Sequence, residues 1–194
     1  MTRQLTMANV LLAAGIASLC GATAQAQDKM SGAKSAQKMG MMTAADKKFA
    51  MAAAHGGIAE VKLGELAAKQ GSSAQVKDFG QKMVEDHGKA NEDLKSVAMS
   101  KGMTLPTEPN AEQKATMARL MKLHGAAFDS AYLKAMKMDH KMDVADFKKE
   151  AMQGKDADIK GFAAKTLPVV ESHYQMLLGM KMGSGSKMGG MKKM

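Results

Sequence analysis

The stretch VKDFGQKMVEDHGKAN, residues 76–91, sets the pattern from which the fold can be predicted. Its apolar residues recur every three or four positions, at Val76, Phe79, Met83 and Ala90. Such spacing places them on one face of an α-helix. His87 falls on the same face, between Met83 and Ala90. The stretch therefore predicts a helix whose buried face carries an ionisable side chain.

Outward from this stretch, three more segments have the same period. The four long helices are predicted to begin at Thr43, at Ser72–Ser73, after Gly125 and at Asp156. The first three are predicted to end near Gly71, Lys101 and Gly154, and Asp46 is the expected capping-box partner of Thr43. A short crossover helix is predicted over 111–123, after the helix-breaking residues 104–110. Pro168, inside the fourth helix, is expected to kink it or to free a carbonyl near Ala164.

The composition supports an all-α protein and argues against nucleic-acid binding. Apolar residues make up 45% of the 194 residues and aromatic residues only 4%, with no tryptophan, and this balance favours helices over sheets. The net charge is +9, but Arg3 and Arg119 are the two arginines. Nucleic-acid-binding proteins normally use more arginine and more stacking aromatic side chains. We therefore expect no nucleic-acid partner.

The N-terminal residues have the features of a secretory signal peptide. Arg3 precedes a short apolar core, residues 7–19, and an Ala24-Gln25-Ala26 cleavage motif. We expect a periplasmic or secreted protein, whose mature form has no cysteine because Cys20 is removed with the signal peptide. The chain is predicted to divide into a signal peptide (1–26), a flexible Met-rich segment (27–43), a helical bundle domain (44–178) and a flexible Met/Lys/Gly-rich tail (179–194).

Each predicted long helix carries ionisable side chains on or beside its apolar face. These are Glu60, His87, Asp139 and Asp143 with His140 at the edge, and His173. An unpaired charge buried there would be costly, so the groups are expected to satisfy one another or to hold an ion. Two interpretations stay open. One is a metal centre, and the other is a structural network, such as Glu60–His87 and Asp139–His173, that fixes the register of the helices.

Several motifs make the chain resemble a known family of exported bacterial proteins. They are Asp46, Phe49, Glu60 and Gly64, the stretch 76–91, LxxLxGAAFDSAY at 120–132, MxxDH at 136–140, and AKTLP at 164–168 followed by His173. Over about residues 44–180 the chain is similar to the family known as domain of unknown function 4142. The resemblance implies export and a ferritin-like four-helix bundle, and it implies no established activity. We expect an all-α, ferritin-like four-helix bundle with a short crossover helix and disordered Met/Lys/Gly-rich tails.

The inward residues do not match the pattern of a di-iron enzyme or of a hydrolase. Di-iron bundles carry E-x-x-H motifs, which do not occur in this sequence. The sequence also has no G-x-S-x-G motif and no phosphate-binding loop. We therefore expect a binding protein and not an enzyme.

The 22 methionines point to copper or silver as the bound ion. Thioether sulfur prefers Cu(I) and Ag(I), and imidazole accepts copper in either oxidation state. Besides Glu60, His87, Asp139, His140 and His173, the predicted ligands are tail residues Met180, Met182, Met188 and Met191. The alternative is a structural or stress-response envelope protein without a metal, whose basic tails contact anionic lipid or polysaccharide. The sequence indicates no particular oligomeric state.

Overall fold

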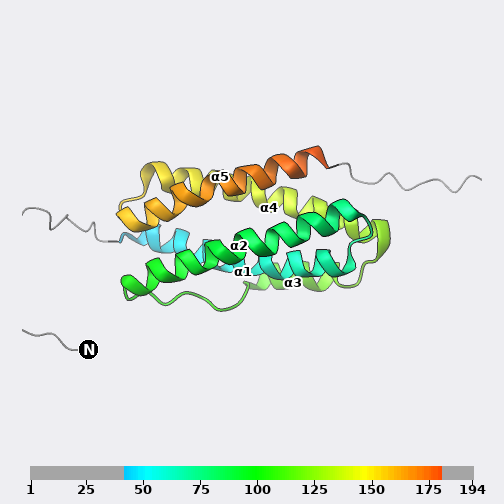
Figure 1. Cartoon of the computed structure of the whole chain (residues 1–194). Helices are drawn as coiled ribbons and strands as arrows, with labels where there is room; N and C mark the ends of the chain where they lie inside the picture. The colour runs from blue at the N-terminus through cyan, green and yellow to red at the C-terminus, as the bar shows by residue number, and fades with distance from the viewer. Residues whose placement is uncertain (1–41, 181–194) are drawn as a thin grey trace, which may run out of the picture. The chain divides into compact units, whose positions relative to one another are not determined.

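The computed structural model describes residues 42–180, which form five α-helices (Figure 1). Their bounds are α1 Ala44–Gln70, α2 Ala74–Ser100, α3 Ala111–Leu120, α4 Gly125–Gln153 and α5 Ala157–Gly179. The expected four-helix bundle with a short crossover helix is confirmed. The predicted signal peptide, the Met-rich segment before Met42 and the tail after Met180 lie outside the described residues.

α1, α2, α3 and α5 begin where a side chain replaces a missing backbone hydrogen-bond partner. The predicted capping box of α1 is present, since the Thr43 hydroxyl accepts a bond from the Asp46 N–H and the Asp46 carboxylate accepts one from the Thr43 N–H. Asn110 and Gln113 form a second capping box at α3. α5 continues as one helix through Pro168.

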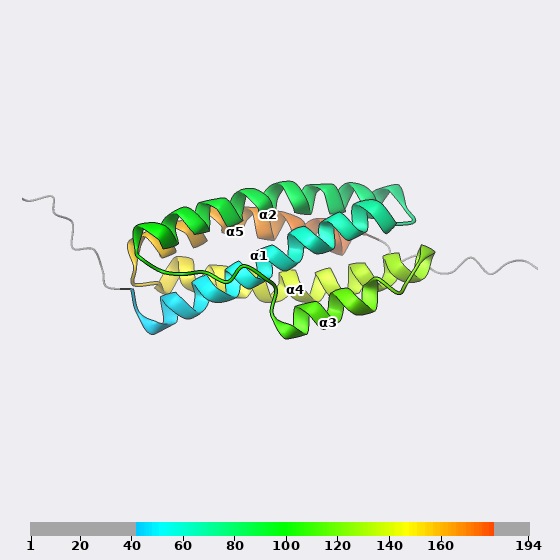
Figure 2. The same ribbon diagram turned by 90° about the horizontal axis from the view of Figure 1, so that it is seen from below.

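The four long helices form two antiparallel hairpins, α1–α2 and α4–α5, and α3 lies against α1 and α4 (Figure 2). Two glycines allow α1 and α2 to pack closely. A Cβ atom added to Gly64 would lie 2.6 Å from the carbonyl oxygen of Gly80, and one added to Gly80 would lie 2.6 Å from that of Gly64. Any larger residue at either position would push the helices apart.

Each hairpin turn is held by an aspartate of the other hairpin. Asp129 in α4 accepts hydrogen bonds from the N–H groups of Ser72 and Ser73, both at 2.8 Å. Asp46 in α1 accepts bonds from the N–H groups of Lys155 and Asp156, at 3.0 and 3.3 Å. Asp46 and Asp129 are 83 positions apart in the sequence, and the turn residues Lys155 and Asp156 follow Ser72 and Ser73 by the same number. The two hairpins therefore brace each other in equivalent ways.

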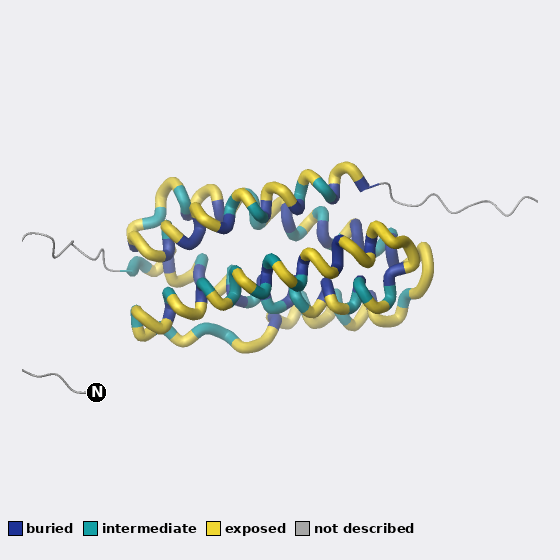
Figure 3. The backbone as a smooth tube through the Cα atoms, viewed as in Figure 1, coloured by how far each residue is buried: buried dark blue, intermediate teal, exposed yellow. Residues whose placement is uncertain are grey.

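The interior consists of two hydrophobic clusters with a polar layer between them. One cluster, near the α1–α2 turn, includes Leu63, Phe79, Tyr132 and Leu177. The other includes Ala54, Leu94, Phe147 and Val170. In Figure 3 the buried positions follow the inward sides of the helices. None of the helices within residues 42–180 combines the length and apolar character needed to cross a membrane.

Candidate metal centre

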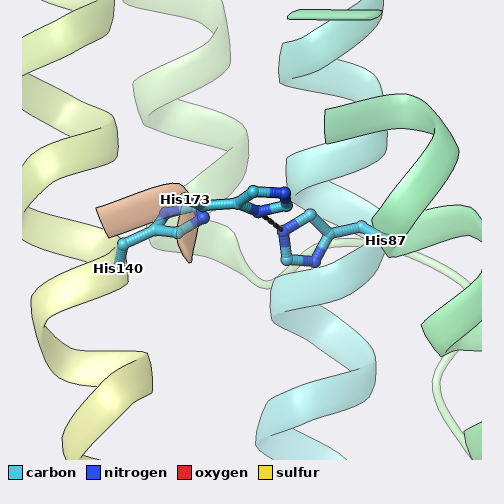
Figure 4. A group of neighbouring side chains, drawn as sticks. All are labelled: His87, His140 and His173. Carbon is cyan, nitrogen blue, oxygen red and sulfur yellow. Dashed lines mark hydrogen bonds between the residues drawn. The ribbon is translucent and has the colours of Figure 1, made fainter. Parts of the chain in front are cut away.

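Four polar residues, one from each long helix, meet between the two hydrophobic clusters. Glu60 comes from α1, His87 from α2, His140 from α4 and His173 from α5. Their exposed fractions are 3%, 4%, 0% and 0%. The three imidazole rings face one another, with centroids 5.1–5.6 Å apart (Figure 4). The four helices thus bring their ionisable groups to a single buried place, which we call the histidine centre.

One nitrogen of each histidine is held by a fixed oxygen acceptor. His87 Nδ1 lies 2.9 Å from Glu60 Oε2. His173 Nε2 donates to Asp86 Oδ2 at 2.8 Å, and His140 Nδ1 donates to the carbonyl oxygen of Met136 at 3.2 Å. Metal-binding histidines commonly donate their second ring N–H to a carboxylate or a backbone carbonyl in this way. Each of the three rings therefore has its orientation fixed by an oxygen atom of another residue.

The other nitrogens of the three rings turn toward one another. His87 Nε2 and His173 Nδ1 are 3.2 Å apart. His140 Nε2 is buried without a hydrogen-bond partner among the described residues, and the Oε1 atom of Glu60, 3.5 Å away, also lacks one. One ligand nitrogen from each histidine lies within 4.8 Å of the others. With metal–nitrogen bonds of about 2.0–2.1 Å, a separation of 3.2 Å corresponds to an angle of roughly 100° at the metal.

Burial keeps the three histidines in the neutral form that binds metals. It lowers the pKa of His87 to about 4, against the opposing effect of Asp139 and Asp86. Burial also lowers the pKa of His173 to about 4. For His140, burial and then the nearby His87 and His173 hold the pKa well below its ordinary value. At neutral pH each ring therefore has one nitrogen lone pair, and an ion bound by all three rings would replace the hydrogen bond between His87 and His173.

A group of carboxyl groups borders the histidine centre on the α4 side. Glu60, Asp139, His140 and Asp143 each offer one ligand atom within 4.8 Å of the others. Burial raises the pKa of Glu60 well above its ordinary value, and Asp139 adds to this. Burial also raises the pKa of Asp139 to about 6, and burial with the neighbouring Glu60 raises the pKa of Asp143. A bound cation would offset the repulsion that these crowded carboxyl groups experience when ionised.

A small cavity adjoins the centre. Its volume is about 20 Å³, and its walls include Gly56, Glu60, His87 and Asp143. A polar cavity of about this size holds one water molecule. The interior next to Glu60 and His87 thus has room for one small ligand.

The structure brings together most of the ligands that the sequence predicted within the bundle. Glu60, His87, His140 and His173 meet in the centre, and Asp139 lies half-buried beside it. Met180 lies elsewhere, in the hydrophobic cluster that contains Leu177. Met182, Met188 and Met191 lie outside the described residues.

Two details of the sequence-based interpretation were wrong. His140, expected at the edge of the apolar face, is completely buried, because it lies one helical turn after the buried Met136. The suggested partner of His173 was Asp139, but His173 pairs with Asp86 on the adjacent helix. Asp86 was missed because it lies beside the apolar face of α2 and not on it. Its position directly before His87 was the available signal.

Comparisons with known proteins agree with this fold. The crystal structure of a DUF305 fragment from Deinococcus radiodurans is similar, with a TM-score of 0.62 and 14% sequence identity. The similarity covers 71% of this chain and 95% of that chain, and at this identity it concerns the fold alone. No curated protein matches the sequence. The family described as Domain of unknown function (DUF4142) matches residues 31–180. The chain therefore belongs to the DUF4142 family of helical domains.

Proposed function

We propose that this protein binds a transition-metal ion, copper in the first place, through His87, His140 and His173, and that it acts as a binding protein and not as an enzyme. The observation that carries the proposal is the arrangement of the six ring nitrogens. One nitrogen of each ring is paired with an oxygen atom, of Glu60, Met136 or Asp86, and one ligand nitrogen of each ring lies within 4.8 Å of those of the other two. His140 Nε2 and Glu60 Oε1 are buried and form no hydrogen bond among the residues that the structure describes, which supports a ligand between the helices.

The donor atoms favour copper or a similar borderline ion in the bundle. Imidazole nitrogen is a good ligand for Cu, Zn, Fe and Ni, and Cu(II) binds most tightly of the divalent first-row ions. Methionine sulfur in the C-terminal tail, at Met182, Met188 and Met191, would suit Cu(I) or Ag(I) as a separate site. We thus propose two classes of site, with nitrogen ligands in the bundle and sulfur ligands in the tail.

Export forms part of the proposal, because a mature copper-binding chain that has lost Cys20 with the signal peptide suits an oxidising compartment. The support is the signal-peptide pattern in residues 1–26. Intact-mass measurement of protein recovered from the periplasm should give a chain that begins at Gln27. A chain that keeps residues 1–26 would contradict export by this route.

The competing function is a structural envelope protein in which the same groups bond only to one another. The contacts between Glu60 and His87 and between His87 and His173 favour it. Such a network satisfies two of the three histidines and leaves His140 Nε2 without a hydrogen bond to any of residues 42–180. The two functions therefore differ most in what His140 does.

Titration of the purified full chain with Cu(II), followed by calorimetry and electron paramagnetic resonance, tests the proposal. We expect saturable binding with nitrogen hyperfine structure, and its loss in His87→Ala, His140→Ala and His173→Ala. His124→Ala is the matched control, because His124 is exposed and its side chain caps no helix. Unchanged binding in all three variants, or no saturable binding to the wild type, would support the structural alternative.

A further inference from the structure

A second, larger cavity lies between α1, α3 and α4, on the side of the bundle that α3 covers. Its volume is about 570 Å³. Ala59 and Leu63 of α1 form part of its wall, and α3 contributes Thr116 and Arg119. From α4 it is lined by Asp139 and three methionines, Met136, Met138 and Met142. The cavity is therefore much larger than the space inside the histidine centre and richer in methionine.

Asp139 connects this cavity with the histidine centre. It lines the cavity, and its carboxylate also belongs to the group of ligand atoms shared with Glu60 and His140. Asp139 is half-buried, so it lies at the border between the cavity and the ligand group. An ion that enters the cavity thus meets an oxygen ligand that is within reach of the centre.

Two exposed methionines of α4 line the same cavity. Met138 is 60% exposed and Met142 is 53% exposed. They are four residues apart, so their side chains lie on one face of the helix. Met136, at 1% exposure, lies deeper in the wall. The cavity therefore offers neutral thioether sulfur both near the solvent and deeper in its wall.

The charged side chains that line the cavity balance one another. Glu112 and Asp139 are balanced there by Arg119 and Lys134. A lining without net charge does not select between monovalent and divalent ions, so the donor atoms decide the preference. Thioether sulfur prefers Cu(I).

We propose that this cavity is the route by which Cu(I) reaches the histidine centre, with Met138 and Met142 as its first ligands and Asp139 as the group that passes it inward. The inference rests on the proposed function, because it needs an ion-binding centre as the destination. It assigns to Met138 and Met142 a role in the rate of loading and none in the final occupancy.

Metal transfer from chromophoric chelators to the full chain, followed by stopped-flow absorbance, tests the route. A His87→Ala chain, which lacks the centre but keeps its tails, is run as the blank. The Met138→Leu/Met142→Leu double variant should load Cu(I) about tenfold more slowly and Zn(II) at nearly the wild-type rate, because the loss of sulfur affects the soft ion. Asp139→Asn should slow both ions, because an amide binds cations less well than a carboxylate does.

Met152→Leu is the matched control. Met152 is also in α4 and is 66% exposed, but it does not line this cavity. Its loading rates should equal those of the wild type, and both Met152→Leu and the Met138→Leu/Met142→Leu double variant should reach the wild-type occupancy. If the double variant fills the centre with Cu(I) at the wild-type rate, the proposed route is wrong and the proposed function is unaffected. If the wild-type centre takes up no ion, both the route and the proposed function are wrong.

Discussion

Asp86 is expected to act on a bound metal through His173 and not by contact. Its carboxylate accepts the His173 Nε2–H bond at 2.8 Å and also pairs with Lys82. In Asp86→Ala the ring loses its fixed orientation, so copper affinity should fall about 10–100-fold. Asp86→Asn keeps an acceptor oxygen and should recover part of the loss. Competition titration measures both.

Glu85→Gln is the control for this prediction. Glu85 is adjacent in sequence, is exposed and pairs with Lys89 on the surface. It should bind copper as the wild type does. Equal affinity of Asp86→Ala and Glu85→Gln would show that His173 needs no partner to bind the ion.

A second prediction at the residue scale concerns pH and Glu150. Burial, together with the hydrogen bond and charge of Asp46, raises the pKa of Glu150 from 4.5 to about 7. A carboxyl group with a raised pKa in the folded state favours folding below its unfolded-state pKa and loses that contribution as the pH rises to about 7. The free energy of unfolding should therefore fall less between pH 4.5 and 7 in Glu150→Gln than in the wild type. Urea denaturation across this range measures the difference, and parallel curves would contradict it.

At the scale of elements, the contact between α1 and α2 depends on Gly80. An added Cβ would lie 2.6 Å from a backbone oxygen of Gly64, which cannot move without shifting α1. Gly80→Ala should therefore lower the free energy of unfolding by about 1–3 kcal/mol, the usual cost of overpacking. Urea denaturation gives the value.

Gly88→Ala in the same helix is the control, because nothing lies within 4 Å of its added Cβ. Alanine favours helix over glycine by about 1 kcal/mol, so this variant should be as stable as the wild type or more stable. Similar losses in both variants would mean that the helix itself, and not the close contact, is sensitive to the change.

For the whole molecule, a bound ion at the histidine centre is expected to raise the free energy of unfolding. The centre separates the two hydrophobic clusters, and two of its buried polar atoms, His140 Nε2 and Glu60 Oε1, have no hydrogen bond within the described part of the chain. Because a ligand stabilises the state that binds it, copper at 100 times its dissociation constant should add about 2.7 kcal/mol to the free energy of unfolding. Thermal unfolding followed by circular dichroism should show a higher midpoint for wild-type protein, reversed by a chelator. A shift of the same size in His140→Ala would place the stabilising ion elsewhere.

Much of this architecture could be predicted from residue spacing. The period around 76–91 placed Val76, Met83 and His87 on one buried face, because an α-helix returns to the same side every three or four residues. The same reasoning predicted Glu60 and His173, and Thr43 and Gly71 marked the ends of α1 through local hydrogen bonding and backbone geometry. These features depend on one helix at a time.

The pairing of side chains between helices required the tertiary structure. Spacing along one helix gives the direction in which a side chain points around the helix axis. It does not give the position of that side chain along the bundle relative to a residue on another helix. That position depends on the Gly64–Gly80 contact and on the turns held by Asp46 and Asp129. The sequence by itself therefore determined that four helices would bury histidines and acids. Only the packing of the hairpins decided that His173 meets Asp86, and that one nitrogen of His140 is left facing the other two rings.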